Sequence, residues 1–142
     1  MRKIIIFLII INLISCKKPN PEPENLFFVE NKSGKDCVFL GYLDSTLQNS
    51  YTIKNNSKIQ VPGNPDMTIA FYNDVNFYFD SIVIRFSDNK YYLNFFPIDT
   101  ITNPRNLFIP KNFIGSHGEK EYIWISTYTI KPEDYQNAIP GK

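Results

Sequence analysis

Short apolar runs separated by polar turns dominate the sequence from about residue 26 onward. In Ser81–Phe86 every second residue from Ile82 is apolar, which is the period of a strand with one buried face. The polar cluster Ser87–Lys90 follows, and Tyr91–Phe96 is a second run of the same kind. This succession predicts a β-hairpin, the clearest one in the chain.

Other runs predict further strands. The predicted strands are Leu26–Asn31, Cys37–Leu43, Tyr51–Ile53, Ile59–Val61, Met67–Tyr72, Leu107–Ile109 and Tyr122–Ile130. Turn clusters at 31–36 and 55–57 each separate two of these runs, which predicts two more hairpins. The run at 122–130 is apolar on both faces, so we expect it to lie centrally in a sheet.

Only the segment 129–139 has the pattern of a helix. Pro132 suits the first helical position, Glu133 and Asp134 favour the positive end of the helix dipole, and Pro140 ends the segment. We expect about two turns. Many short strands with one helix predict a mainly β fold, an antiparallel β-sandwich or open barrel with one short C-terminal helix.

The N-terminus has the pattern of a secretory signal peptide. Arg2 and Lys3 precede the apolar run Ile4–Ile11, which is too short to span a bilayer that needs about 20 apolar residues. The following Leu13–Cys16 resembles the lipobox of bacterial lipoproteins. That resemblance implies cleavage before Cys16 and lipidation of Cys16, with a multi-chain lipid anchor that holds the protein stably on a membrane.

The lipobox divides the chain into three parts. These are a lipoprotein signal peptide at 1–15, the lipidated Cys16 with a Pro-rich, solvated tether at 16–25, and a single β-rich domain at 26–142. Cys16 is followed by Lys17 and not by Asp. By resemblance to the sorting rule of enterobacterial lipoproteins, this favours the outer membrane of the cell envelope and leaves open which side the domain faces.

Composition excludes some partners. The chain has 15 basic and 14 acidic residues, and Arg2 and Lys3 are lost with the signal peptide. The mature chain is therefore close to neutral, and we predict no nucleic acid as partner.

With Cys16 lipidated, Cys37 has no partner for a disulfide, and its apolar neighbours favour a buried thiol. One histidine, His117, gives no zinc spacing, so we predict no metal and no cofactor.

An aromatic cluster is the strongest candidate binding site. Phe71, Tyr72, Phe77, Tyr78 and Phe79 surround a short stretch that is rich in Asn and Asp. Such side chains, if exposed, stack on sugars or hold a peptide. The alternative is that they cover the hydrophobic core from a loop.

Three short motifs suggest modification. Asp44-Ser45, Asp80-Ser81 and Asp99-Thr100 are each followed by Thr or Ile, and they resemble the acceptor motif for O-glycosylation in some Gram-negative periplasms. The resemblance implies Ser45, Ser81 and Thr100 as acceptors. Asp-Ser is also common in turns.

No catalytic constellation is predicted. Ser116 and His117 are adjacent in the loop Gly115–Gly118, whereas the members of a catalytic triad converge from separate segments. Glu119 and Glu121 lie near a strand start and could supply the two carboxylates of a small hydrolase, although two such acids are usually a solvated edge.

The sequence therefore favours a non-enzymatic, lipid-anchored binding or structural module with the membrane and an envelope protein or glycan as partners. Alternatives are a small envelope hydrolase, or an inhibitor or immunity-type lipoprotein that inserts Phe71–Phe79 into a partner. The domain also resembles small lipoproteins of the Bacteroidota type in its Asn31–Gly34 turn and its closing Tyr128–Tyr135 segment. That resemblance implies no functional residue.

Overall fold

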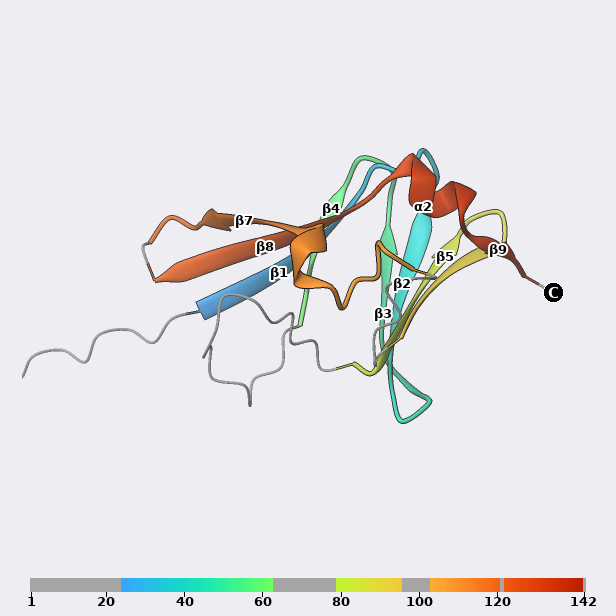
Figure 1. The fold of residues 1–142 in the computed structure, drawn as a ribbon, viewed down its shortest axis with the longest axis horizontal. Helices are drawn as coiled ribbons and strands as arrows, with labels where there is room; N and C mark the ends of the chain where they lie inside the picture. The colour runs from blue at the N-terminus through green and yellow to red at the C-terminus, as the bar shows by residue number, and fades with distance from the viewer. Residues whose placement is uncertain (1–23, 63–78, 96–102, 121, 142) are drawn as a thin grey trace, which may run out of the picture.

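The computed structural model describes residues 24–62, 79–95, 103–120 and 122–141, which form two stacked β-sheets (Figure 1). The mainly β fold with one short C-terminal helix is confirmed, and its two-sheet form is consistent with a β-sandwich. The strands are β1 Glu24–Asn31, β2 Cys37–Leu43, β3 Thr46–Ile53, β4 Lys58–Val61, β5 Ser81–Phe86, β6 Lys90–Phe95, β7 Phe113–His117, β8 Ile123–Ile130 and β9 Ile139–Pro140. The helical elements are the 3-10 turn η1 Pro110–Asn112 and the helix α2 Pro132–Gln136.

The four-stranded sheet has the order β4-β1-β8-β7. Its central pair, β1 and β8, is parallel, with Val29 opposite Tyr128, while β4 and β7 pair antiparallel at the two edges. The first and last long strands of the domain therefore lie side by side, and the predicted central position of the 122–130 run is confirmed.

The five-stranded sheet has the order β3-β2-β5-β6-β9 and is antiparallel throughout. The predicted 81–96 hairpin is confirmed as β5 and β6, with Ile84 opposite Tyr92. Asn89 in its turn has φ +63°, a left-handed conformation that Asn tolerates well.

A single hydrophobic core fills the space between the sheets. Val29 and Tyr128 reach it from the four-stranded sheet, and Phe39 and Ile84 reach it from the five-stranded sheet, all fully buried. Each of these residues lies at the alternating position that points inward from its strand, which is why the period-2 pattern located the strands.

Two predicted hairpins are wrong. The run at 26–31 lies in β1 and the run at 37–43 lies in β2, and these two strands belong to different sheets. The runs at 51–53 and 59–61 lie in β3 and β4, which also belong to different sheets. The turn clusters between them carry the chain from one layer to the other. Asn31 holds this crossing: it is fully buried, and its side-chain amide donates to the carbonyls of Lys35 and Ile53 at 2.8 and 3.0 Å.

Smaller corrections concern element bounds. β1 begins at Glu24, two residues before the predicted start of the domain, and α2 spans five residues, less than two turns. The predicted strand Leu107–Ile109 is buried, but it forms a turn. The backbone amide of Leu107 donates to Asn94 Oδ1 instead of pairing with a neighbouring strand. The predicted strand Met67–Tyr72 lies outside the described residues.

Candidate functional site

The predicted aromatic cluster contributes one described residue, and that residue is buried. Phe79 is 4% exposed and belongs to the core. A Cβ added to Gly41 would lie 2.6 Å from its ring, so the ring fills the space that this glycine leaves on β2. Phe79 is therefore a packing residue, which corrects its prediction as a binding residue. Phe71, Tyr72, Phe77 and Tyr78 lie outside the described residues.

The two described O-glycosylation candidates differ in accessibility. Ser45 is exposed at the tip of the β2–β3 turn with φ +63°. Ser81 is half-buried at the start of β5, and its hydroxyl donates to Asp80 Oδ1 at 2.8 Å. Of the pair, Ser45 is the hydroxyl that an enzyme can reach. Thr100 and Cys16 lie outside the described residues.

The candidate catalytic residues do not converge. The predicted loop at 115–118 is largely the strand β7, so Ser116 and His117 point to opposite faces of the sheet. His117 lies edge-on to Trp124 with ring centroids 4.8 Å apart, and Glu119 is exposed. Glu121 lies outside the described residues. Within the described ranges, His, Cys, Asp and Glu form no group of three that could hold a metal ion.

Cys37 is a buried thiol, 2% exposed at the start of β2. Burial, together with the nearby Asp36 carboxylate, raises the pKa of this thiol to about 12. Because the thiolate is the nucleophilic form, Cys37 is inert at neutral pH in the folded protein.

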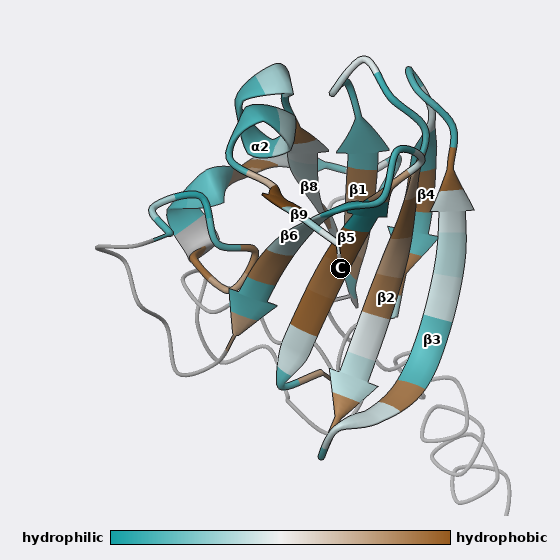
Figure 2. Cartoon of the chain, turned by 90° about the vertical axis from the view of Figure 1, so that its right-hand side faces the viewer, coloured by the Kyte–Doolittle hydropathy of each residue, from teal (hydrophilic) through white to brown (hydrophobic). Residues whose placement is uncertain are grey.

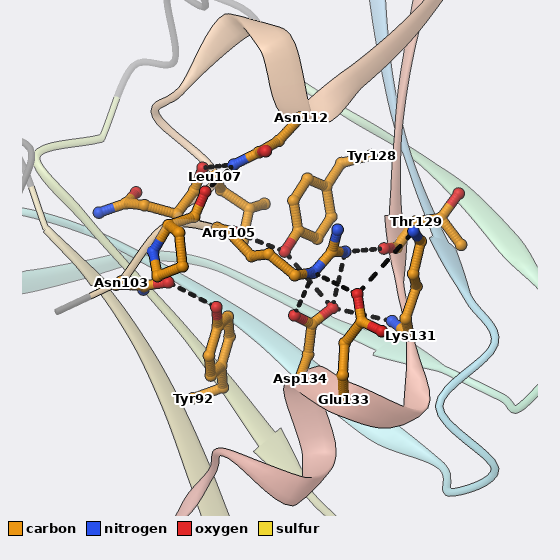
Figure 3. A network of polar contacts seen from close by, with 12 residues as sticks. Tyr92, Asn103, Arg105, Leu107, Asn112, Tyr128, Thr129, Lys131, Glu133 and Asp134 are labelled. Atoms are coloured by element: carbon orange, nitrogen blue, oxygen red, sulfur yellow. Dashed lines mark hydrogen bonds and ion pairs between the residues drawn. The ribbon is translucent and has the colours of Figure 1, made fainter. Parts of the chain in front are cut away.

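Arg105 and Asp134 form the centre of a polar network that joins the 103–112 segment to β8 and α2 (Figure 3). Arg105 donates to both carboxylate oxygens of Asp134 and to the carbonyl of Thr129. The backbone amide of Lys131 donates to Asp134 as well, at 2.8 Å. The Asp134 hydrogen bond raises the pKa of Arg105 further above its usual value, so the Arg105 guanidinium stays charged.

Two tyrosines complete this network. The Tyr128 hydroxyl donates to the carbonyl of Arg105 at 2.7 Å, and the Tyr92 hydroxyl donates to Asn103 Oδ1 at 2.5 Å (Figure 3). Burial raises the pKa of both phenols, which therefore remain protonated. Since Asp134 is completely buried and paired, this cluster stabilises the fold and does not offer a reactive group.

The outer face of the five-stranded sheet is the most extensive candidate surface. In β2, Cys37, Phe39 and Gly41 point into the core, so the alternate residues of the same strand point outward. The register extends this face across the neighbouring strands. Its apolar members are Val38, Leu40, Tyr42, Leu47, Val83, Tyr91, Leu93, Phe95 and Ile139. Figure 2 shows this sheet from the outer side.

Exposure is concentrated on this face. Four large apolar side chains of the described residues are exposed, and three of them, Leu47, Phe95 and Ile139, belong to it at 49, 52 and 54%. The fourth, Ile114, lies on the outer side of β7 in the other sheet. The outer face of a sandwich sheet is ordinarily polar, so this concentration of apolar side chains makes the face a candidate interaction surface of the described residues.

A shallow groove of about 400 Å³ lies at one end of the face, and its lining includes the charged residues Asp36, Lys54 and Arg85. Lys54 donates to Asp36 at 2.8 Å; this bond, followed by one from the Asn55 amide, lowers the pKa of the Asp36 carboxyl. Arg85 is exposed in the same groove and has no ion pair among the described residues.

Sequence reasoning missed this surface. The signal was present, because Cys37–Leu43, Ser81–Phe86 and the run from Tyr91 each carry apolar residues on both faces. Only assembly of the three strands side by side makes one continuous patch of them.

Comparisons with known proteins add no family. No family model matches the chain, and searches of curated proteins and of solved structures found no significant match. Among the described residues, no helix has the length and apolar character needed to cross a membrane.

Proposed function

We propose that this chain is a lipid-anchored, non-enzymatic binding protein of the bacterial cell envelope. The proposal joins two features. The first is the signal peptide and lipobox ending at Cys16, from which the anchor on the outer membrane is inferred. The second is the apolar outer face of the five-stranded sheet, which is the observation that supports a binding role most strongly.

The position of β1 relates the two features. The tether joins β1 at Glu24, on the side of the four-stranded sheet that lies away from the five-stranded sheet (Figure 1). The outer face of the five-stranded sheet therefore points away from the end at which the lipid is attached. A domain anchored in this way presents that face to partners in the envelope.

The competing functions have less support. A hydrolase needs two carboxylates at a set separation around its substrate, and the one described candidate, Glu119, is exposed in a turn. An inhibitor that inserts Phe71–Phe79 into a partner would lack Phe79, whose ring is committed to the core. The outer face of the five-stranded sheet therefore remains the favoured binding surface.

Anchoring is tested by fractionation of cells that express the full chain or its Cys16→Ser variant, with metabolic labelling by palmitate. We expect the native chain in the membrane fraction with label, and the variant in the soluble fraction without label. Equal fractionation of the two forms, with no label in the native chain, would overturn the anchor.

Binding is tested in the same cells by a photo-activatable amino acid at position 93 on the proposed face. The matched control carries it at position 114, where the exposed Ile114 lies on the other sheet. We expect a discrete cross-linked species from position 93 alone. The absence of any adduct at position 93, or equal adducts at both positions, would contradict a specific binding face.

A further inference from the structure

We infer that the outer face of the five-stranded sheet binds the same face of a second copy of this chain, forming a two-fold symmetric dimer. The inference rests on the proposed function, since it names the partner of the surface proposed there. It is carried by the arrangement of apolar and charged residues along β5 and its neighbours.

The face consists of three rows that run across the strands. The middle row contains Leu40, Val83 and Leu93, one on each of three adjacent strands. The row on one side has Val38 and Tyr91 at the flanks of β5, and the row on the other side has Tyr42 and Phe95. The apolar pattern is therefore nearly the same above and below the middle row.

This symmetry suits a two-fold axis that lies along the middle row, across the strands. Such an axis places each strand over its own copy, so that Leu40 and Val83 meet their equivalents and Tyr91 meets Phe95 of the second copy. A two-fold interface of this kind requires one patch that complements itself. Two sheets that pack face to face normally lie about 10 Å apart, with their side chains between them.

The charged residues favour this axis over a two-fold axis that runs along β5. Arg85 lies near one end of β5 and Asp80 directly precedes the other end, about 16 Å away along the strand. Across the strands, the axis brings Arg85 of each copy over Ser81 of the other, next to Asp80 at the end of that strand. An axis along β5 would instead bring the two Arg85 guanidinium groups together, which like-charge repulsion disfavours.

Both charges are available for such a pair. Asp80 accepts hydrogen bonds from the Asp44 amide and the Ser81 hydroxyl, at 2.7 and 2.8 Å, and neither donor carries a charge. Asp44, which is exposed beside it, adds a second negative charge at this end of the face. Neither acid forms an ion pair with any cation of the described residues.

The size of the face indicates weak association in solution. Four strands about 4.8 Å apart and about 20 Å long, with the two-residue β9 beside them, give a flat footprint of roughly 400 Å², about half of the usual 800 Å² per partner. Attachment of both copies to one membrane raises their local concentration. Because the axis places the two β1 starts on opposite sides of the interface, pairing also requires each domain to lie on its side, which the Pro-rich tether expected at 16–25 permits. We therefore expect dimers in membranes and a shift to monomers on dilution in detergent.

Cross-linking in membranes tests the dimer with the full, lipidated chain. Val83→Cys puts a thiol beside the axis, and Ile114→Cys is the control on the opposite sheet; the buried Cys37 thiol does not compete. A short bis-maleimide should convert the Val83→Cys chain to dimer at least about fivefold more than the control. Equal yields would overturn the dimer.

Charge variants of the Val83→Cys chain test the choice of axis. Arg85→Glu should reduce the yield about fivefold, Arg85→Lys should retain it, and Arg85→Glu with Asp80→Lys should restore it. Thermal unfolding of each variant checks that it folds. A yield insensitive to Arg85→Glu in a folded variant would overturn this arrangement.

Different results would overturn the dimer and the lipid-anchored binding module. A photo-adduct at position 93 that contains only another protein, without Val83→Cys dimers, would overturn the dimer and leave the binding module standing. Loss of membrane attachment would overturn the anchor, whatever the cross-linking yield at high protein concentration.

Discussion

Arg105 donates hydrogen bonds from Nε and Nη2 to the two carboxylate oxygens of Asp134, at 2.6 and 2.9 Å. Asp134 is completely buried at the first turn of α2, whereas Arg105 comes from the segment after β6. A two-point contact between a guanidinium and a carboxylate fixes direction as well as distance. This pair thus sets how the C-terminal helix sits on the sandwich.

Removal of Asp134 should strongly destabilise the domain. Asp134→Ala removes the buried carboxylate that accepts from both the Arg105 guanidinium and the Lys131 amide, and breaking a buried pair in this way costs about 3–5 kcal/mol. Urea unfolding of the full chain measures the change. Glu133→Gln is the matched control: Glu133 also pairs with Arg105, at 3.3 Å, but is half exposed, and its loss should cost under about 1 kcal/mol. Similar losses for the two variants would contradict the structural role of Asp134.

A methyl group at residue 41 should displace Phe79. In Gly41→Ala the new Cβ would lie 2.6 Å from the Phe79 ring, and overpacking of this kind costs about 1–3 kcal/mol. Adding Phe79→Leu should recover part of the loss in the double variant. The stability of the three variants is compared by urea unfolding. If Gly41→Ala is as stable as the native chain, Phe79 does not pack on β2.

The Cys37 thiol should resist alkylation until the domain unfolds. At pH 8 the native full chain should take up no iodoacetamide at Cys37, and it should take up one equivalent in urea, because burial raises the thiol pKa to about 12. Mass spectrometry counts the adducts. Rapid alkylation of the folded chain would show that this thiol is accessible.

The same shift has a consequence for stability at high pH. The pKa of the Cys37 thiol in the folded chain lies above its unfolded value of about 8.5. The stabilisation of the folded chain by its protonated thiol is therefore complete below pH 8.5 and is lost as the pH rises toward 12. Between pH 9 and 11, unfolding free energy should therefore fall more steeply for the native chain than for Cys37→Ala. Parallel curves for the two chains would contradict a buried, neutral thiol.

If the chain is glycosylated in its native host, Ser45 should carry more glycan than Ser81. Ser45 is exposed at a turn, while the Ser81 hydroxyl is bonded to Asp80 and half-buried. Intact-mass analysis of the native chain, Ser45→Ala and Ser81→Ala measures the added hexose. Loss of glycan in Ser81→Ala but not in Ser45→Ala would reverse this assignment.

Local signals were sufficient to predict part of the fold. The β5–β6 hairpin was predictable because alternation and turn chemistry lie within 81–95, and β8 showed its central position by apolar residues on both faces. Pro132 and the two acids after it correctly located α2. In each case the pattern that allowed the prediction lies within one short segment of the sequence.

Pairings between distant segments were not predictable in this way. The sequence pattern of Leu26–Asn31 gives no sign that it pairs in parallel with β8, about a hundred residues away, so a hairpin with the next run was the natural but wrong expectation. Arg105 was missed for a similar reason, since its partner Asp134 is remote in sequence. The outer apolar face is likewise a property of three strands together.

The most direct test of the proposed lipid anchor is the mass of the mature N-terminus. The full-length gene is expressed in a Gram-negative host, and the N-terminal peptide of the membrane-bound product is analysed by tandem mass spectrometry. The proposal predicts that the first residue is Cys16 with a diacylglyceryl thioether. An N-terminus at any other residue, or an unmodified Cys16 thiol, would contradict it.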